Sequence, residues 1–346
     1  MSKKLEKKYA QLAAKKALEL LAIDSPTGYT EEAANWIVKE FSDLGYKAEK
    51  TRKGGVIVDL GGEGDGLVLA AHTDTLGAMV HQIKGNGRLK ITNLGGLVPA
   101  NVETENVRVR TRDGQVYEGT IQFNNASSHV NKDVRSAERT WDNVEVVLDE
   151  NVKNADDVKK LGIQNGDMVC VEPRSRITKD GYIKSRFLDD KLSVAILLGY
   201  ATYLKDKKIT PNCHLYVYTT VYEEVGHGAS ASIPEGVTDM ISVDMGCVGE
   251  GLSCTERQVS ICAKDSGGPY NYQLTNRMIE AAKKEGADYA VDIYPFYGSD
   301  VEGTLRAGFD IRHGLIGPGV YASHGYERSH VDGVYASLQL LKGLIG

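Results

Sequence analysis

The pattern of apolar residues changes twice along the chain, and this change constrains the fold more than any other feature. Before about residue 76 and after about residue 181, helix-like periodic segments alternate with short apolar runs typical of buried strands. Between 77 and 180, short β-like runs are separated by Gly, Asn and Asp turns, including the hairpin signal Arg112–Gln115. The sequence therefore predicts an α/β domain, formed by residues 1–76 and 181–346, that is interrupted by an inserted β-rich domain at 77–180.

Acidic residues and a histidine gather at the ends of four apolar runs in the predicted α/β domain. They are His72 with Asp74, Asp189 with Asp190, Glu223 with Glu224, and Asp244. The carboxyl ends of strands are where open α/β sheets place their sites. Each motif alone also has a structural explanation, because Asp189 and Asp190 could cap a helix, Asp244 could cap a turn, and paired glutamates are common on surfaces. Their shared position at strand or helix ends favours a single site.

The adjacent carboxylates of Glu223 and Glu224 repel each other unless a cation or a shared proton compensates them. This layout is expected of one metal ligand beside one general base. One imidazole and one or two carboxylates per ion, with a shared carboxylate, can hold two divalent metals about 3.5–4 Å apart with room for a bridging hydroxide. Nitrogen and oxygen ligands without thiolate fit Zn, Co or Mn.

In their order, these motifs resemble the M42 family of metallo-aminopeptidases, and the resemblance covers nearly the whole chain. The segments that carry it are Ile23–Glu32, Ala71–Asp74, Arg186–Lys191, Glu223–Gly226, Val243–Asp244, Tyr297–Asp300 and a late histidine. The resemblance implies a three-layer α/β/α di-metal peptidase domain. It also implies that the insertion is a PDZ-like or barrel-like domain that helps to build dimers and larger shells, up to a tetrahedral dodecamer.

Through the same resemblance, each residue receives an expected role. The expected metal ligands are Asp189 as the bridge, His72 and Asp244 on one ion, and Glu224 and His324 on the other. Glu223 would be the general base, Asp74 would orient His72, and Asp190 would cap the following helix. The family's His-Ser-Pro-x-Glu pattern at the last ligand is here His-Gly-Tyr-Glu, which leaves His330 as an alternative to His324.

Composition and charge exclude several other classes of protein. No apolar run approaches the roughly 20 residues of a membrane span. The start, Met1–Ala10, lacks the apolar core of a signal peptide and indicates an amphipathic helix. Five cysteines without a Cys-x-x-Cys motif suggest reduced thiols, and a net charge of −6 gives no reason to expect nucleic acid. We therefore expect a cytoplasmic protein with no nucleic-acid or membrane partner, and the family resemblance implies that its substrate is a peptide.

The sequence is compatible with three functions. The leading prediction is a two-metal exo-aminopeptidase that removes N-terminal residues through a metal-bridging hydroxide. The second is an amidohydrolase for an N-acylated dipeptide or a dipeptide amide, since Ser323–Arg328 and the segment 124–141 resemble a bacterial subgroup linked to an osmoprotectant of that kind. The third is a non-catalytic peptide-binding scaffold. Candidate wall residues for a substrate pocket are Tyr297, the loop 298–300 and Arg312.

Overall fold

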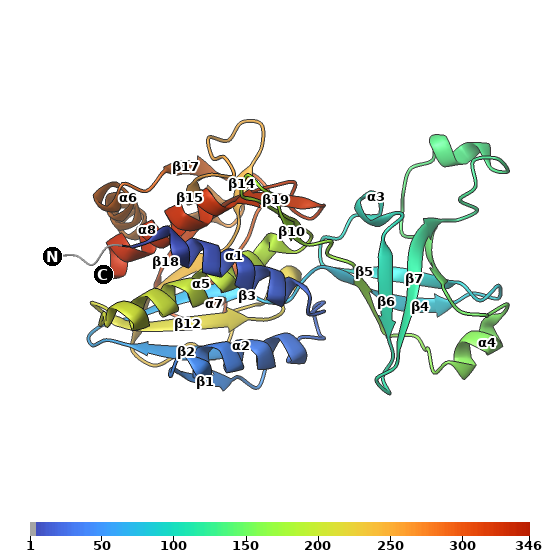
Figure 1. The fold of residues 1–346 in the computed structure, drawn as a ribbon, viewed down its shortest axis with the longest axis horizontal. Helices are drawn as coiled ribbons and strands as arrows, with labels where there is room; N and C mark the ends of the chain where they lie inside the picture. The colour runs from blue at the N-terminus through green and yellow to red at the C-terminus, as the bar shows by residue number, and fades with distance from the viewer. Residues whose placement is uncertain (1–4) are drawn as a thin grey trace. The chain divides into compact units, whose positions relative to one another are not determined.

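The computed structural model describes residues 5–346, which form two units (Figure 1). Thr75–Pro173 make one unit, and the described residues before and after them make the other. Residues 1–4 of the predicted amphipathic start lie outside the described residues, and the first helix begins at Lys7. Across the described part of the chain, no helix is both long and apolar enough to cross a membrane.

The first unit is built around one large sheet flanked by helices. Its helices are α1 (Lys7–Leu21), α2 (Glu31–Asp43), α5 (Leu188–Lys207), the 3-10 turn η2 (Glu223–Val225), α6 (Tyr272–Glu285), α7 (Asp300–Arg306) and α8 (Val331–Ile345). Its strands are β1 (Lys47–Lys50), β2 (Val56–Gly61), β3 (Gly66–His72), β10 (Arg176–Ile177), β11 (Tyr182–Ser185), β12 (His214–Thr220), β13 (Val237–Val243), β14 (Gly246–Val248), β15 (Val259–Asp265), β16 (Gly268–Pro269), β17 (Tyr289–Ile293), β18 (Arg312–Tyr321) and β19 (Glu327–His330).

At the centre of this sheet, β3 lies between β12 and β13 and runs parallel to both. All seven residues of β3 are buried. Since successive side chains of a strand point to opposite faces, both faces of the sheet are covered here. Because both of its faces are covered, β3 has apolar residues at successive positions instead of an apolar-polar alternation. Parallel pairing also brings the carboxyl ends of β3, β12 and β13 to the same edge of the sheet.

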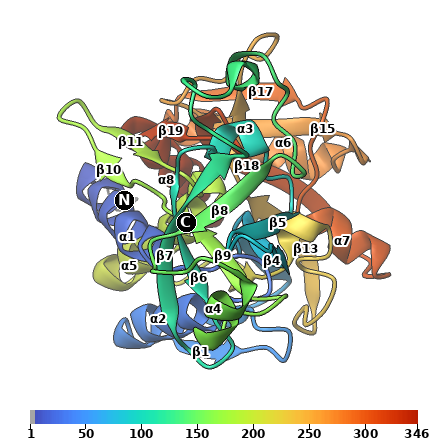
Figure 2. The ribbon, with the colours of Figure 1, turned by 90° about the vertical axis from the view of Figure 1, so that its right-hand side faces the viewer.

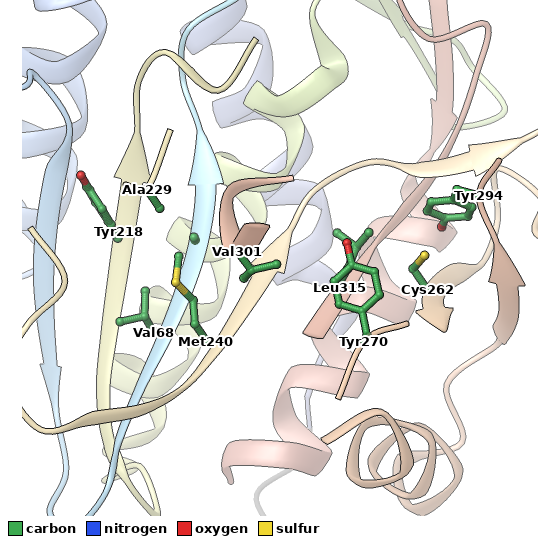
Figure 3. Packing of buried hydrophobic residues seen from close by; sticks show 10 residues of the cluster. Val68, Tyr218, Ala229, Met240, Cys262, Tyr270, Tyr294, Val301 and Leu315 are labelled. Atoms are coloured by element: carbon green, nitrogen blue, oxygen red, sulfur yellow. The ribbon is translucent and has the colours of Figure 1, made fainter. Parts of the chain in front are cut away.

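One face of the sheet packs against α7 through a cluster of buried side chains (Figure 3). Val68 and Ala70 of β3, Tyr218 of β12 and Met240 of β13 contribute to this cluster, and Val301 of α7 packs among them. Complete burial of a valine or methionine side chain, such as those of Val68, Met240 and Val301, stabilises a fold by about 1.5–3 kcal/mol each. This packing fixes the positions of the carboxyl ends of β3, β12 and β13.

The second unit is a closed six-stranded antiparallel barrel, seen from two sides in Figures 1 and 2. Its elements are β4 (Gly77–Ile83), β5 (Leu89–Leu94), α3 (Pro99–Val102), β6 (Asn106–Arg110), β7 (Val116–Phe123), the 3-10 turn η1 (Lys132–Arg135), β8 (Val144–Leu148), α4 (Ala155–Lys160) and β9 (Met168–Val171). The strands close in the order β4-β5-β8-β7-β6-β9.

The predicted hairpin at Arg112–Gln115 is confirmed, since Arg110 of β6 pairs with Val116 of β7 across it. The predicted fold class, an α/β domain with a β-rich insertion, is confirmed as well, and the insertion is barrel-like. The sequence places residues 75–76 in the α/β domain and 174–180 in the insertion, whereas in the structure 75–76 belong to the barrel unit and 174–180 to the first unit. The physical reason is that β10 pairs with β11, which in turn pairs with β19 of the large sheet.

Candidate metal centre

Residues from four elements of the first unit meet at the carboxyl edge of the large sheet. His72 ends β3, and its backbone neighbour across the sheet is Thr220, the last residue of β12. Asp244 directly follows β13, which is the other neighbour of β3. Asp189 lies at the start of α5, where it and Asp190 keep non-helical backbone angles and are joined by a cis peptide bond.

Left-handed backbone conformations shape three of the segments that carry these side chains. Tyr222 has φ 69° and Gly226 has φ 88°, and between them the 3-10 turn η2 holds both glutamates. In a strand the two side chains would point to opposite faces, but at this turn both reach the same site. Phe187 and His324 also have positive φ, 67° and 61°. Such conformations cost non-glycine residues of order 1–3 kcal/mol and gather at functional sites.

His72 is oriented so that one ring nitrogen faces the acids. Its Nδ1 lies 2.8 Å from the main-chain oxygen of Asp74, which can only accept, so Nδ1 donates and neutral His72 directs the lone pair of Nε2 toward the site. Nε2 is 3.0 Å from Asp189 Oδ1 and 3.7 Å from Glu223 Oε2. An imidazole nitrogen facing two carboxylates is an arrangement that suits a cation between them.

Asp74, which the sequence names as the residue that orients His72, contacts the other ring nitrogen through its main chain. Its carbonyl oxygen accepts the hydrogen bond from Nδ1, and its carboxylate oxygen Oδ1 lies 3.7 Å from the same nitrogen. The carboxylate accepts hydrogen bonds from Thr27 Oγ1 at 2.6 Å and from the main-chain N–H of Glu223 at 3.2 Å. Asp74 therefore links the end of β3 to the turn that carries the glutamates.

The two candidate histidines of the C-terminal segment lie in different places. His324 Nε2 is 3.6 Å from Asp189 Oδ2 and 3.8 Å from Glu224 Oε2. His330 precedes α8, where its Nδ1 accepts from the N–H of Asp332 at 2.9 Å. His330 Nε2 is 2.7 Å from the carbonyl oxygen of Asp180. The structure thus brings His324 to the site and uses both ring nitrogens of His330 elsewhere.

Two overlapping groups of side chains have donor atoms close enough to share an ion. His72, Asp190 and Asp244 form one group, and His72, Asp189 and Glu224 form the other, with the donor atoms of each group within 4.8 Å of one another. Asp190, which the sequence suggested only as a helix cap, accepts from the His72 N–H at 3.2 Å and is fully buried. The buried atoms Asp190 Oδ1 and Glu224 Oε1 have no hydrogen-bond partner in the structure.

The pKa values of the site residues are shifted because many carboxyl groups are buried close together. Burial and the charges of neighbouring acids raise the pKa of Glu224 well above its usual value, and they raise the pKa of Asp244 to about 8. Burial alone would lower the pKa of His72, but its hydrogen bond to Asp189 and the charge of Glu223 raise that pKa well above the usual value. Divalent cations would compensate the crowded negative charge, so the residues present fit a metal centre.

In the metal-free protein, the free energy of unfolding is expected to fall as the pH rises from about 5 to about 8. The pKa of Asp244 is raised to about 8, mainly by burial, and burial also raises the pKa of Asp300 to about 6. The native protein then binds more protons than the unfolded chain in this interval, so the free energy of unfolding falls as these carboxyls ionise. Thermal unfolding with a chelator across this pH range measures the effect, which Asp244→Asn should reduce. An unfolding midpoint that stays level or rises would contradict it.

Glu327 is a functional candidate that the sequence reasoning missed. It begins β19, is 2% exposed, and holds two of the ligand segments by their main chains. Its Oε2 accepts from the N–H of Asp189 at 3.1 Å, and its Oε1 accepts from the N–H of His324 at 3.1 Å. The available signal was its place three residues after His324, one position before the glutamate of the His-Ser-Pro-x-Glu pattern, which lies four residues after the histidine.

A cavity of about 640 Å³ opens beside these residues within the first unit. Asp189, Glu223, Glu224, Asp244 and His324 line one side of it. The remaining wall contains Met245, Cys247, Phe296, Tyr297, Gly298, Ser299, Glu302 and Arg306, among others. Of the predicted wall residues, Tyr297 and the start of its loop are present. Arg312 is not, because its guanidinium pairs with Asp239 away from the cavity.

Comparison with known proteins identifies relatives across nearly the whole chain. The family model described as M42 glutamyl aminopeptidase matches residues 54–340. The protein YhfE of Bacillus subtilis (strain 168), named as a provisional aminopeptidase, is 43% identical over 325 residues, which are 93% of this chain and 94% of YhfE.

Solved structures also share the fold, and two of them serve as examples. The aminopeptidase APDkam598 of Desulfurococcus kamchatkensis is 21% identical and has a TM-score of 0.85, covering 98% of this chain and 94% of that chain. The TET1 peptidase of Pyrococcus horikoshii, which can assemble into a tetrahedron or a large octahedral shell, is 20% identical with a TM-score of 0.85. The match covers 96% of this chain and 98% of that one.

Proposed function

Since the chain belongs to the M42 glutamyl aminopeptidase family, we propose that it is a metal-dependent exo-aminopeptidase that removes N-terminal residues from peptides. One observation carries the proposal. Two overlapping groups of metal-type ligands lie beside a cavity, whose wall includes Asp189, Glu224 and Asp244 from these groups. Glu223, a carboxylate outside both groups, lies 3.7 Å from the histidine they share. This is the arrangement that metal-assisted hydrolysis of an amide requires.

We assign the ligands of two divalent ions, Zn, Co or Mn, to the residues that meet at the sheet edge. Asp189 lies between His72 and His324 and is the shared ligand, since its Oδ1 faces the first and its Oδ2 faces the second. Asp244 completes the set on the His72 side, and Glu224 completes it on the His324 side. When bound, such ions polarise a carbonyl and make a water molecule acidic near neutral pH.

Glu223 is the residue that we propose as general base. Its carboxyl takes a proton from the attacking water and later gives it to the amine of the leaving peptide. Burial raises the pKa of Glu223 well above its usual value, which suits a group that must both accept and return a proton. Asp74 fixes the backbone of Glu223 through the hydrogen bond to its N–H. Glu327 fixes the backbones of Asp189 and His324 in the same manner.

The test uses metal-stripped protein refilled separately with Zn, Co or Mn and given free-amine peptides beside their N-acetylated, C-amidated counterparts. We expect metal-dependent release of the first residue from the free-amine peptides only. Cleavage of the blocked dipeptide amides would replace the aminopeptidase with the amidohydrolase. Binding of metals and peptides without cleavage of either set would favour a peptide-binding scaffold.

We further propose that the chain forms a homo-oligomer, in a range from a dimer to a tetrahedral dodecamer. The support is its fold, which it shares with a TET peptidase that assembles into closed shells. Light scattering on the purified protein measures the particle mass directly, and a monomer at micromolar concentration would contradict the proposal.

A further inference from the structure

A lysine outside the metal centre holds the segment that follows the glutamate pair. Lys53 lies in the turn between β1 and β2, and its Nζ donates to the carbonyl oxygens of His227 and Gly228. It also donates to Ser230 Oγ at 3.3 Å. One side chain from a turn of the sheet thus binds three oxygen atoms of a segment that begins only three residues after Glu224.

The segment 227–230, which Lys53 binds, is linked to Glu223 by hydrogen bonds and a ring contact. The N–H of His227 donates to the carbonyl oxygen of Tyr222 at 3.1 Å, and the N–H of Gly226 donates to that of Glu223 at 2.7 Å. The rings of Tyr222 and His227 stack with centroids 5.1 Å apart and an angle of 19° between their planes. The residues before and after the glutamates therefore form one closed turn, and a shift of the His227 carbonyl must shift Glu223 as well.

Contacts with the protein interior hold the same segment from other directions. Thr304 Oγ1 of α7 donates to the Ala229 carbonyl oxygen at 2.9 Å. Gly228 lies so close to Asp300 that an added Cβ would come within 1.8 Å of its Oδ1. Lys53 also lies 5.9 Å from the ring centroid of Tyr222 and interacts with the charges of Asp300 and Asp74. The turn is thus fixed between α7 and Lys53.

We propose that Lys53 is a positioning residue for the reaction: it holds the 227–230 segment so that the Glu223 carboxylate keeps its place beside His72. This inference rests on the proposed role of Glu223 as general base. Lys53 is absent from the described residues that line the cavity, so it acts through the turn rather than on the substrate. Misplacing a reacting group by about 1 Å can cost as much as 10²-fold in rate, and this sets the scale of the expected effect.

Lys53→Met tests the proposal because it removes the three donated hydrogen bonds and keeps an unbranched side chain. We expect kcat to fall by about 10- to 100-fold while KM changes less than about twofold and both metals stay bound. Lys53→Arg keeps a cationic donor and should recover kcat to within about fivefold of the original protein. Lys50→Met is the matched control: Lys50 binds Asn35 and Glu31 of α2, and its replacement should leave kcat unchanged.

Hydrogen–deuterium exchange provides a readout that does not depend on activity. We expect faster exchange of the amides of residues 222–230 in Lys53→Met, with or without metals, and no change in the barrel strands. Unchanged exchange there, or a kcat within twofold of the original, would overturn the proposal. A loss of kcat in Lys53→Arg and in Lys50→Met as large as that in Lys53→Met would also overturn it. If the unaltered protein releases no N-terminal residue, the proposed function fails, whereas the exchange measurement still decides whether Lys53 holds the turn.

Discussion

Glu223→Gln is expected to lower kcat by about two to four orders of magnitude while both metals remain bound. The amide has nearly the volume of the carboxylate but cannot take a proton from water at neutral pH. Glu223 lies outside the two groups of side chains that could share an ion, so its replacement leaves those groups intact. Steady-state kinetics on a free-amine peptide, together with the metal content per chain, measure both parts of the prediction.

Glu224→Gln is the matched control for this experiment. The neighbouring glutamate belongs to the group with His72 and Asp189, and one of its buried oxygens has no hydrogen-bond partner in the structure. Its replacement should therefore reduce metal content along with activity. Near-normal turnover in Glu223→Gln would remove this residue as the base. A parallel loss of metal and activity in both variants would assign Glu223 to the ligands instead.

Glu327→Gln is expected to weaken metal binding by about 10- to 100-fold, although Glu327 is not among the proposed ligands. Both carboxylate oxygens accept main-chain N–H groups, one from Asp189 and one from His324. Glutamine offers one acceptor oxygen and an NH₂ group that only donates, so one buried N–H would face another donor. An unsatisfied buried donor costs about 1–3 kcal/mol, and here that cost falls on the backbone of a ligand segment.

Chelator competition on the refilled protein measures this change in affinity, and thermal unfolding of the metal-free form measures the accompanying loss of stability. Glu256→Gln is a suitable control, because Glu256 pairs with Arg328 beside the same strand without binding a ligand segment. An unchanged metal affinity in Glu327→Gln would show that the ligand segments keep their geometry without the two hydrogen bonds.

The sequence predicted those parts of the molecule whose cause is local. An apolar run with no polar interruption predicted the fully buried β3, and the Arg112–Gln115 turn predicted the hairpin of the barrel. The α/β class and the M42 family were also predicted and are confirmed. In these cases, residues close together in the chain contain the whole signal.

Features that depend on distant contacts could not be predicted in the same way. Glu327 meets Asp189 across 138 residues, and Lys53 meets His227 across 174. His324 and His330 are six positions apart in similar polar stretches of sequence. Their different roles follow from the conformation of the main chain at each residue. A left-handed conformation accompanies the first histidine at the acids, and the start of α8 binds the second.

The order of the strands in the chain has a consequence for how the protein is made. The barrel is one continuous stretch of sequence, so all its strands can pair as soon as residue 171 has left the ribosome. β3 emerges before the barrel but must wait for both of its neighbours, β12 and β13, which come after it. A ribosome-bound nascent chain should therefore contain a finished barrel beside an apolar strand without partners. That strand carries the first metal-type ligand of the site.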